Sequence, residues 1–501
     1  MPKRSEWRDS GGGFVAAIGH CSAEKDASAG GGEGAMDFEP VKLHAMPKGS
    51  GRLTFVRRLL ANPATAAPAE LFEARVFSPA FARKKLAYVA DRDVLETIFI
   101  ERPEDFPKGR IDERILRPIF GDGLLLAEPD DWRWKRRLTA PVFSPAAMKR
   151  FMPGIVAPFA ETAQTFLAAK GEPVDVSEAM KSATLAVIDR LIFGARREID
   201  PDRIMNHVDT YLAPTSWMVA YALFSLPQAT PFPGRARQRR ARIDSRAMLS
   251  DFVARRRAGD LSTDDLCNRL ITASDPETGR ALSDDDMVDM LLTLQSAGHE
   301  TSANALAWAI HLLTRMQDVQ ERLIAEIDSV TAGEPVEPDH MPRLATVRAF
   351  VEETMRLFPP APTLSRTVRA AERLGGLTLE AGASILVPVY LIHRHPAYWE
   401  RPDVFDLDRF LAPPGGRPAR TVYMPFGAGP KICVGAQLAL TEMTAGIASL
   451  LQAVRFRKAD GPEPRLLHRV TLRSAESLMA IAEPRRDGAA PELSRPATVP
   501  A

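Results

Sequence analysis

The sequence predicts a mainly α-helical fold with small β-sheets, and three observations support this. Three long segments carry apolar residues at three- and four-residue spacings, which is the pattern of a helix with a buried face: residues 174–194, 287–316 and 436–454. Strand-like alternation is short and sparse. Proline-rich corners such as RLFPPAP and TPFPG separate the predicted elements.

The strands and the last helix can be placed along the chain. Short alternating segments predict strands at KLAYVA near Leu86, at SILVPVYL near Ile385 and at TLRSAESLMAIA towards the C-terminus. The last long helix is predicted to begin near Val434, directly after a glycine-rich loop. The strands are too few and too short to dominate the fold.

Biased composition marks both ends of the chain. SGGG and SAGGGEGAM have the composition of flexible linkers, so residues 1–45 are predicted to be a disordered extension. Its apolar piece FVAAI is too short for a signal-peptide core. Residues 486–501 form a proline-rich polar tail with the same expectation. No such linker and no internal repeat interrupts residues 46–485, which predicts a single domain there.

The overall composition excludes several classes of protein. A formal net charge of +1 gives no indication of nucleic-acid binding. No apolar run approaches the roughly 20 residues of a membrane span. The three cysteines, Cys21, Cys267 and Cys433, are too far apart for a CxxC zinc site, and a disulfide framework is not expected at this length. This usage suits a reducing cytoplasm, which is the predicted location.

The loop PFGAGPKICVG, residues 425–435, surrounds one cysteine with three glycines. Gly427, Gly429 and Gly435 allow positive φ and close approach to a flat object. Cys433 precedes a helix N-terminus, which favours an anion, so a thiolate with a lowered pKa is expected. From the residues alone it could be a nucleophile, a redox centre or a metal ligand, and haem iron accepts one thiolate.

This loop resembles the haem-binding loop of the cytochrome P-450 family, F-x-x-G-x-R-x-C-x-G. Phe426, Gly429, Cys433 and Gly435 match, and Gly427 lies within the same loop. Lys431 stands where arginine or histidine is more usual, which keeps the charge but loses the planar fork for a haem propionate. The resemblance implies haem b with Cys433 as the axial iron ligand.

The segment AGHETS, residues 297–302, lies midway along the longest predicted helix. Gly298 costs about 1 kcal/mol relative to alanine inside a helix, and the Thr301 hydroxyl can bond the carbonyl of Ala297 or turn towards a ligand. The segment resembles the family's A-G-x-[D/E]-T signature. The resemblance implies that Ala297 and Gly298 lie against the haem, that Thr301 hydrogen-bonds dioxygen and that Glu300 belongs to a proton relay.

EETMRLFPP places Glu353 and Arg356 three residues apart, on one helix face. This pair resembles the family's E-x-x-R motif, which a later arginine completes. Arg409 in RPDVFDLDRF is the candidate third member. The resemblance implies a buried charge network that supports the haem side of the fold and takes no part in the chemistry.

DDWRWKRRLTAPVF resembles the family's W-x-x-x-R helix, with Trp132 and Arg136 one turn apart. Both side chains could reach haem carboxylates, one through its N–H and one through its charge. Arg366, which follows the E-x-x-R helix, is the other candidate for a propionate contact.

Together these resemblances imply a cytochrome P-450 of the soluble bacterial type, with the haem between a long oxygen-side helix and the cysteine loop. It would be a monomeric monooxygenase that inserts one atom of O2 into an apolar molecule, such as a fatty acyl or terpenoid compound. NAD(P)H would supply electrons through a separate ferredoxin or flavodoxin/flavin reductase. Position in the family places Ala297, Thr363, Leu364 and Leu478 in the substrate pocket.

Two alternatives remain. A peroxide-driven haem-thiolate peroxygenase would keep Cys433 but would not need Glu300 and Thr301, and a haem sensor would need an effector domain that the sequence lacks. For the redox partner, Arg133, Lys135 and Arg137, together with the lysine of the cysteine loop, predict a basic patch that docks an acidic electron donor.

Overall fold

The computed structural model describes residues 38–194, 199–223, 226–227, 229–259, 261, 265–411 and 416–485. The described residues begin at Phe38, within the extension 1–45 predicted from composition. The backbone oxygen of Phe38 accepts a hydrogen bond from the Phe405 amide (3.1 Å), and the Leu43 amide donates to the Tyr390 hydroxyl (2.9 Å). Residues 1–37 and the predicted tail, 486–501, lie outside the described residues.

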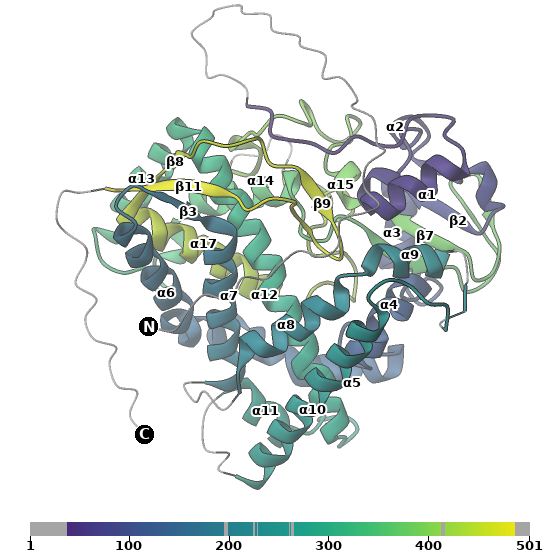
Figure 1. The fold of residues 1–501 in the computed structure, drawn as a ribbon, viewed down its shortest axis with the longest axis horizontal. Coiled ribbons are helices and arrows are strands. Elements are labelled where there is room, and N and C mark those ends of the chain that lie inside the picture. The colour runs from purple at the N-terminus through teal and green to yellow at the C-terminus, as the bar shows by residue number, and fades with distance from the viewer. Residues whose placement is uncertain are drawn as a thin grey trace, which may run out of the picture. The chain divides into compact units, whose positions relative to one another are not determined.

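Helices dominate the described part of the chain, as predicted (Figure 1). They are α1 (Arg52–Ala61), α2 (Leu71–Ala74), α3 (Arg92–Glu96), α4 (Arg110–Phe120), α5 (Pro129–Thr139), α6 (Pro145–Ala168), α7 (Val176–Phe193), α8 (Pro201–Leu212), α9 (Thr215–Leu223), α10 (Arg235–Ala258), α11 (Leu266–Thr272), α12 (Asp284–Arg315), α13 (Gln317–Thr331), α14 (Ala345–Leu357), α15 (Val389–Ile392), α16 (Asp408–Leu411) and α17 (Ala436–Ala453). Among these helices, none combines the length and apolarity needed to cross a membrane.

Four small sheets accompany the helices (Figure 1). The largest has the order β1-β2-β7-β4, in which β2 and β7 are parallel and the other pairs antiparallel. The others have the orders β3-β11-β8, β10-β9 and β5-β6. The strands are β1 (Val76–Phe77), β2 (Leu86–Val89), β3 (Pro173–Asp175), β4 (Leu364–Thr367), β5 (Glu372–Leu374), β6 (Leu377–Leu379), β7 (Ser384–Val387), β8 (Val454–Lys458), β9 (Leu466–His468), β10 (Leu472–Ser474) and β11 (Met479–Pro484).

Two predicted strands are shorter than expected. The segment near Ile385 leaves the sheet at Pro388, which has no N–H to donate to a neighbouring strand, and continues as helix α15. The C-terminal segment is divided between β10, which pairs with β9, and β11, which pairs with β8 and β3. Its alternating pattern therefore spans two different sheets.

Helix α12 is the central element of the site. It begins with a capping box, in which Ser283 and Asp286 exchange hydrogen bonds. Three aspartates in its first turn interact favourably with the positive end of the helix dipole. It packs against α7, α14 and α17. Trp308 of α12 stacks on Phe358, just after α14, with ring centroids 4.3 Å apart. This packing holds one face of α12 against the segments that form the site.

Candidate haem and oxygen site

A cavity of about 310 Å³ lies between α12 and the loop that precedes α17. Ala297, Gly298 and Thr301 line it from α12, whereas Phe426 and Cys433 line it from the loop. Its size is within the range of small-molecule sites in proteins, and most of its other lining residues are apolar. The structure therefore brings the two strongest sequence motifs to opposite walls of one cavity.

Backbone hydrogen bonds and one glycine determine the course of the cysteine loop. The amide of Cys433 donates to the Phe426 carbonyl (3.0 Å), and the amide of Ile432 donates to the Gly429 carbonyl (3.1 Å). Gly429 has a φ of 72°, and a Cβ there would lie 1.7 Å from the backbone oxygen of Phe99. No other residue fits at this position without a shift of the loop.

The other two glycines of the loop differ from each other. Gly427 has a φ of 76°, as expected, and its Cβ would meet only Leu364, at 3.9 Å. Gly435 is the N-cap residue of α17 with a φ of −87°, so the expectation of positive φ is wrong for it. A Cβ at Gly435 would lie 4.0 Å from the Cys433 sulfur, in ordinary contact.

The Cys433 thiol is exposed to the cavity. Burial within the protein raises its pKa, and the Gly435 amide, Arg136 and Lys108 only partly offset this effect. The expectation of a lowered pKa is therefore wrong for the free thiol, because desolvation outweighs the helix N-terminus. A coordinated metal ion deprotonates a thiol outright, so this direction does not conflict with a role as a metal ligand.

Four cationic side chains line the same cavity: Lys108, Arg136, Arg366 and Lys431. None of them forms an ion pair with an acid in the described part of the chain. Burial and the charge of Arg366 lower the pKa of Lys108 to about 8, and burial lowers that of Arg366 to about 10. Asp112 attracts Lys108 and Arg366 but forms no ion pair with either, so part of the positive charge remains uncompensated and would be neutralised by an anionic group.

These four cations are suited to bind the two carboxylates of haem b. The Lys431 ammonium and the Arg136 guanidinium lie 5.6 and 5.9 Å from the centre of the Trp132 ring, which also lines the cavity. Arg136 in addition donates to the Ile432 carbonyl (2.8 Å), within the cysteine loop. Lys108 was not identified from the sequence, since a single lysine in FPKGR carries no pattern that predicts burial. The residues present fit haem.

The iron of such a group would depend on one protein ligand. Across the described residues, no group of three or more His, Cys, Asp or Glu side chains could hold a metal ion. A metal at Cys433 would therefore need its remaining ligands from a prosthetic group, as in haem.

Helix α12 passes the cavity without interruption. A Cβ at Gly298 would lie 2.8 Å from the Ile188 side chain on α7, so this glycine permits close packing of two helices. The Thr301 hydroxyl donates to the Ala297 carbonyl (2.6 Å), which is one of the two orientations considered from the sequence.

Glu300 lies away from the cavity. It does not belong to the lining residues, and its carboxylate accepts a hydrogen bond from the Thr471 hydroxyl (2.6 Å). Burial raises its pKa. The acid and the alcohol are adjacent in sequence but face different groups in this structure.

A second acid, Glu442 of α17, was missed by the sequence analysis. It is 2% exposed, lines the cavity and hydrogen-bonds Ser302, while its Oε1 has no partner. Burial raises its pKa to about 8. The available signal was a lone acid in an otherwise apolar helical segment, QLALTEMTAGIASLL.

The predicted substrate residues divide into two groups. Ala297 and Leu364 line the cavity, whereas Thr363 and Leu478 do not. Leu478 lies beside α7, where its amide donates to the Ser177 hydroxyl (3.0 Å) and its carbonyl accepts from the Val176 amide. Leu478 lies outside this cavity because it directly precedes β11, whose pairing with β3 begins at Met479.

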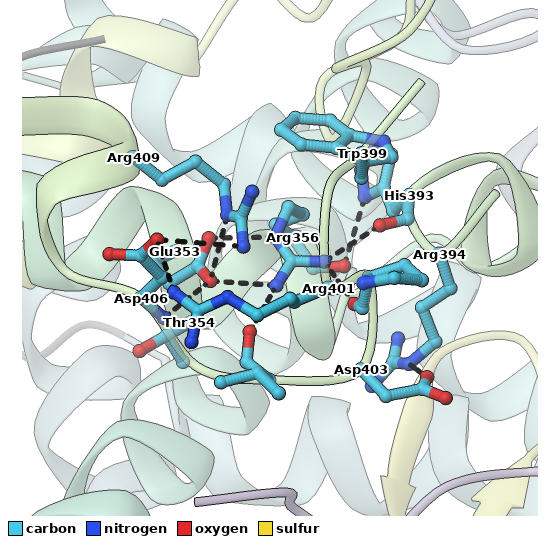
Figure 2. Close-up of polar contacts among 12 residues, drawn as sticks. Glu353, Thr354, Arg356, His393, Arg394, Trp399, Arg401, Asp403, Asp406 and Arg409 are labelled. Carbon is cyan, nitrogen blue, oxygen red and sulfur yellow. Dashed lines mark hydrogen bonds and ion pairs between the residues drawn. The ribbon is translucent and has the colours of Figure 1, made fainter. Parts of the chain in front are cut away.

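Glu353, Arg356 and Arg409 form a buried network (Figure 2). Arg356 donates to both Glu353 carboxylate oxygens at 2.7 Å, and the Arg409 Nε lies 3.4 Å from one of them. The side chains of Glu353 and Arg356 are 0% exposed. Arg356 also donates to the carbonyls of His393, Pro402 and Val404, which ties α14 to the following loops.

His393 connects this network to the cysteine loop. Its Nε2 accepts from the Met424 amide (3.0 Å), so its Nδ1 carries the proton and donates to the Arg356 carbonyl (3.1 Å). Burial lowers the pKa of His393 to about 3, which keeps the ring neutral. The loop that carries Cys433 is thus positioned from α14.

The predicted basic patch is wrong for Lys135. This side chain is 2% exposed and pairs with Asp286 (2.6 Å), and Arg137 pairs with Asp275 (2.7 Å). Arg133 is 61% exposed and pairs with Asp130 (2.7 Å). The helical spacing that suggested a solvated face did not reveal that α12 covers part of it.

The comparisons with known proteins agree with this geometry. A family model described as cytochrome P450 matches residues 70–479. Cyclooctat-9-en-7-ol 5-monooxygenase of Streptomyces melanosporofaciens is 31% identical over 380 residues, which cover 75% of this chain and 81% of the relative. Pentalenene oxygenase of Streptomyces avermitilis is 28% identical over 372 residues, 74% and 81% of the two chains. The solved cytochrome P450DA haem domain has a similar fold, with a TM-score of 0.75 and 24% identity over 89% of this chain and 99% of that chain. The chain belongs to the cytochrome P450 family and is a monooxygenase of that family.

Proposed function

We propose that this monooxygenase inserts one atom of O2 into an apolar terpenoid, with electrons from NAD(P)H delivered by a separate ferredoxin or flavin protein in the cytoplasm. The observation that carries the proposal is the cavity itself, which joins a single cysteine, the hydroxyl of Thr301 and four cations that form no ion pair among the described residues. The relatives named for cyclooctat-9-en-7-ol and pentalenene favour a terpenoid over a fatty acyl substrate.

Each group has a distinct task in this proposal. Cys433 binds the haem iron, while Lys108, Arg136, Arg366 and Lys431 hold the two carboxylates. Haem bound through a thiolate supplies the oxygen chemistry, because the electron-rich sulfur favours cleavage of the O–O bond.

The protein side chains provide the protons. Thr301 turns its hydroxyl from the Ala297 carbonyl towards the cavity and orders a water there, and Glu300, which lies outside the cavity lining, supplies the proton through this water. The apolar lining holds the substrate and limits the entry of bulk water, which would otherwise divert protons.

The alternative is a peroxygenase that uses hydrogen peroxide. It would not need Glu300 or a path from that acid to Thr301. The buried carboxyl of Glu300 on α12 favours the O2-dependent reaction, because burying a carboxyl is costly without a function.

Two measurements test the proposal. A panel of diterpene and sesquiterpene alcohols, fatty acids and aromatics should be screened for shifts in the haem spectrum, with a terpenoid expected to bind tightest. The best ligand is then incubated with O2 and a ferredoxin system, or with hydrogen peroxide alone. Oxidised product only with O2 and the electron donor supports the proposal, whereas equal turnover with peroxide alone would refute it.

A further inference from the structure

The carboxylate of Glu300 is held by a turn that the proposed reaction does not yet use. Residues 469–471 connect β9 to β10, and the Thr471 hydroxyl lies 2.6 Å from Oε1 of Glu300. The side chain of Asn304, one helical turn after Glu300, donates to the same hydroxyl (3.2 Å). Because an amide NH2 only donates, Thr471 accepts from Asn304 and directs its own proton to Glu300.

We propose that Thr471 is a positioning residue for proton delivery: it holds the Glu300 carboxylate beside the β9–β10 turn, and Glu300 serves Thr301 from this anchored position. Thr471 is 5% exposed and Asn304 is 8% exposed, so water does not compete freely for these bonds. The inference rests on the proposed function, in which Glu300 supplies the proton.

The turn itself is anchored to the surroundings of the cavity. The amide of Leu472 donates to the carbonyl of Pro360, a residue that lines the cavity (3.0 Å). Arg469 donates to the Ser216 hydroxyl on α9 (2.7 Å). These bonds connect the position of the Thr471 hydroxyl to the cavity rim and to a helix distant in sequence.

The charges around Glu300 come from three other elements. Asp209 of α8 favours its protonated form, whereas Arg473 of β10 and Lys181 of α7 favour its ionised form, as does the Thr471 hydroxyl. Burial also raises the pKa of Asp209, so its ionisation could produce a similar dependence of stability on pH and needs a control. Loss of the Thr471 hydroxyl should therefore raise the pKa of Glu300 further.

The first test measures the bond without relying on turnover. Thr471→Val keeps the shape of the side chain and removes the donor, and Thr471→Ser keeps the donor. The bond stabilises ionised Glu300, so the stability deficit of Thr471→Val in urea unfolding should grow as pH rises through the pKa of Glu300. In a Glu300→Gln background, where Asp209 still titrates, the deficit should not vary with pH, which separates the effect of Glu300 from that of Asp209. A deficit independent of pH in both backgrounds would overturn the proposal.

The second test measures the consequence for proton delivery. The fraction of reducing equivalents released as hydrogen peroxide is followed against pH, and it should rise as Glu300 loses its proton. Because Thr471 positions Glu300, Thr471→Val should raise the peroxide fraction at low pH, where Glu300 is protonated in both proteins, and should move the remaining rise to higher pH. Thr471→Ser should restore the wild-type profile, and Glu300→Gln should remove the rise. If the stability experiment succeeds but the peroxide profile does not move, the bond is real and the positioning role is refuted. If Glu300→Gln itself has no effect on peroxide release, the assignment of Glu300 in the proposed function fails instead.

Discussion

The buried network around Glu353 gives a sharp prediction about stability. Glu353→Gln keeps the size of the side chain but removes the negative charge that Arg356 and Arg409 share. The new NH2 group would face guanidinium N–H groups, so two charge-assisted hydrogen bonds of 2.7 Å are lost or weakened. Each is worth about 1.5–3 kcal/mol, and breaking a buried pair on one side costs about 3–5 kcal/mol.

The neighbouring acid on the same helix provides a matched control. Glu352 is 4% exposed, but its partners Arg417 and Arg348 are 61% and 38% exposed and stay hydrated when the pairs are broken. Glu352→Gln should therefore cost about 1 kcal/mol. The free energy of unfolding of the haem-loaded proteins, measured in urea, checks both values. Equal losses for the two variants would refute the conclusion that the charge of Glu353 matters because its partners are buried.

Three further outcomes are expected. Gly429→Ala should destabilise the protein by at least about 2 kcal/mol in urea unfolding and weaken haem retention, because its Cβ would meet the Phe99 backbone. Gly427 has a similar φ but no such clash, so Gly427→Ala should cost less. The pKa of Glu442 is about 8 in the folded protein, against an ordinary value of 4.5, so the free energy of unfolding should fall as pH rises between these values. Glu442→Gln should lose less stability over this range, with a gain relative to wild type of at most roughly 5 kcal/mol in urea unfolding. A difference that does not vary with pH would contradict the burial argument. Thr301→Ala should keep substrate affinity but divert reducing equivalents to hydrogen peroxide, with coupled product falling by about 10²-fold or more, and full coupling in this variant would exclude the hydroxyl from proton delivery.

The parts of the site that local geometry determines could be predicted from the sequence. Glu353 and Arg356 lie three residues apart on one helix, so their pairing follows from helix geometry once the helix is recognised. The long helix over Thr301 and the glycine loop before Cys433 carry their own periodicity and turn chemistry. These features did not depend on knowing which distant segments pack together.

The parts that depend on tertiary packing could not be predicted in this way. Lys135 has the spacing of a solvated face, yet it is buried against Asp286 of α12. Leu478 lies outside the cavity because the strand that follows it pairs with β3, and the Glu300 carboxylate bonds a hydroxyl 171 residues away in the chain. The pKa of the Cys433 thiol is raised and not lowered, because the burial that raises it comes from segments outside the loop. In each case the deciding contact joins segments that no local pattern connects.

The central claim is that Cys433 is the thiolate ligand of the haem iron, and the spectrum of the reduced carbon monoxide complex tests it most directly. The wild-type protein should show the strongly red-shifted Soret band of thiolate ligation. Cys267→Ala, which alters a buried cysteine of α11, should leave that band unchanged. Cys433→Ser should lose the band while still binding haem through the cationic side chains around the cavity. A red-shifted band that persists in Cys433→Ser would contradict the account.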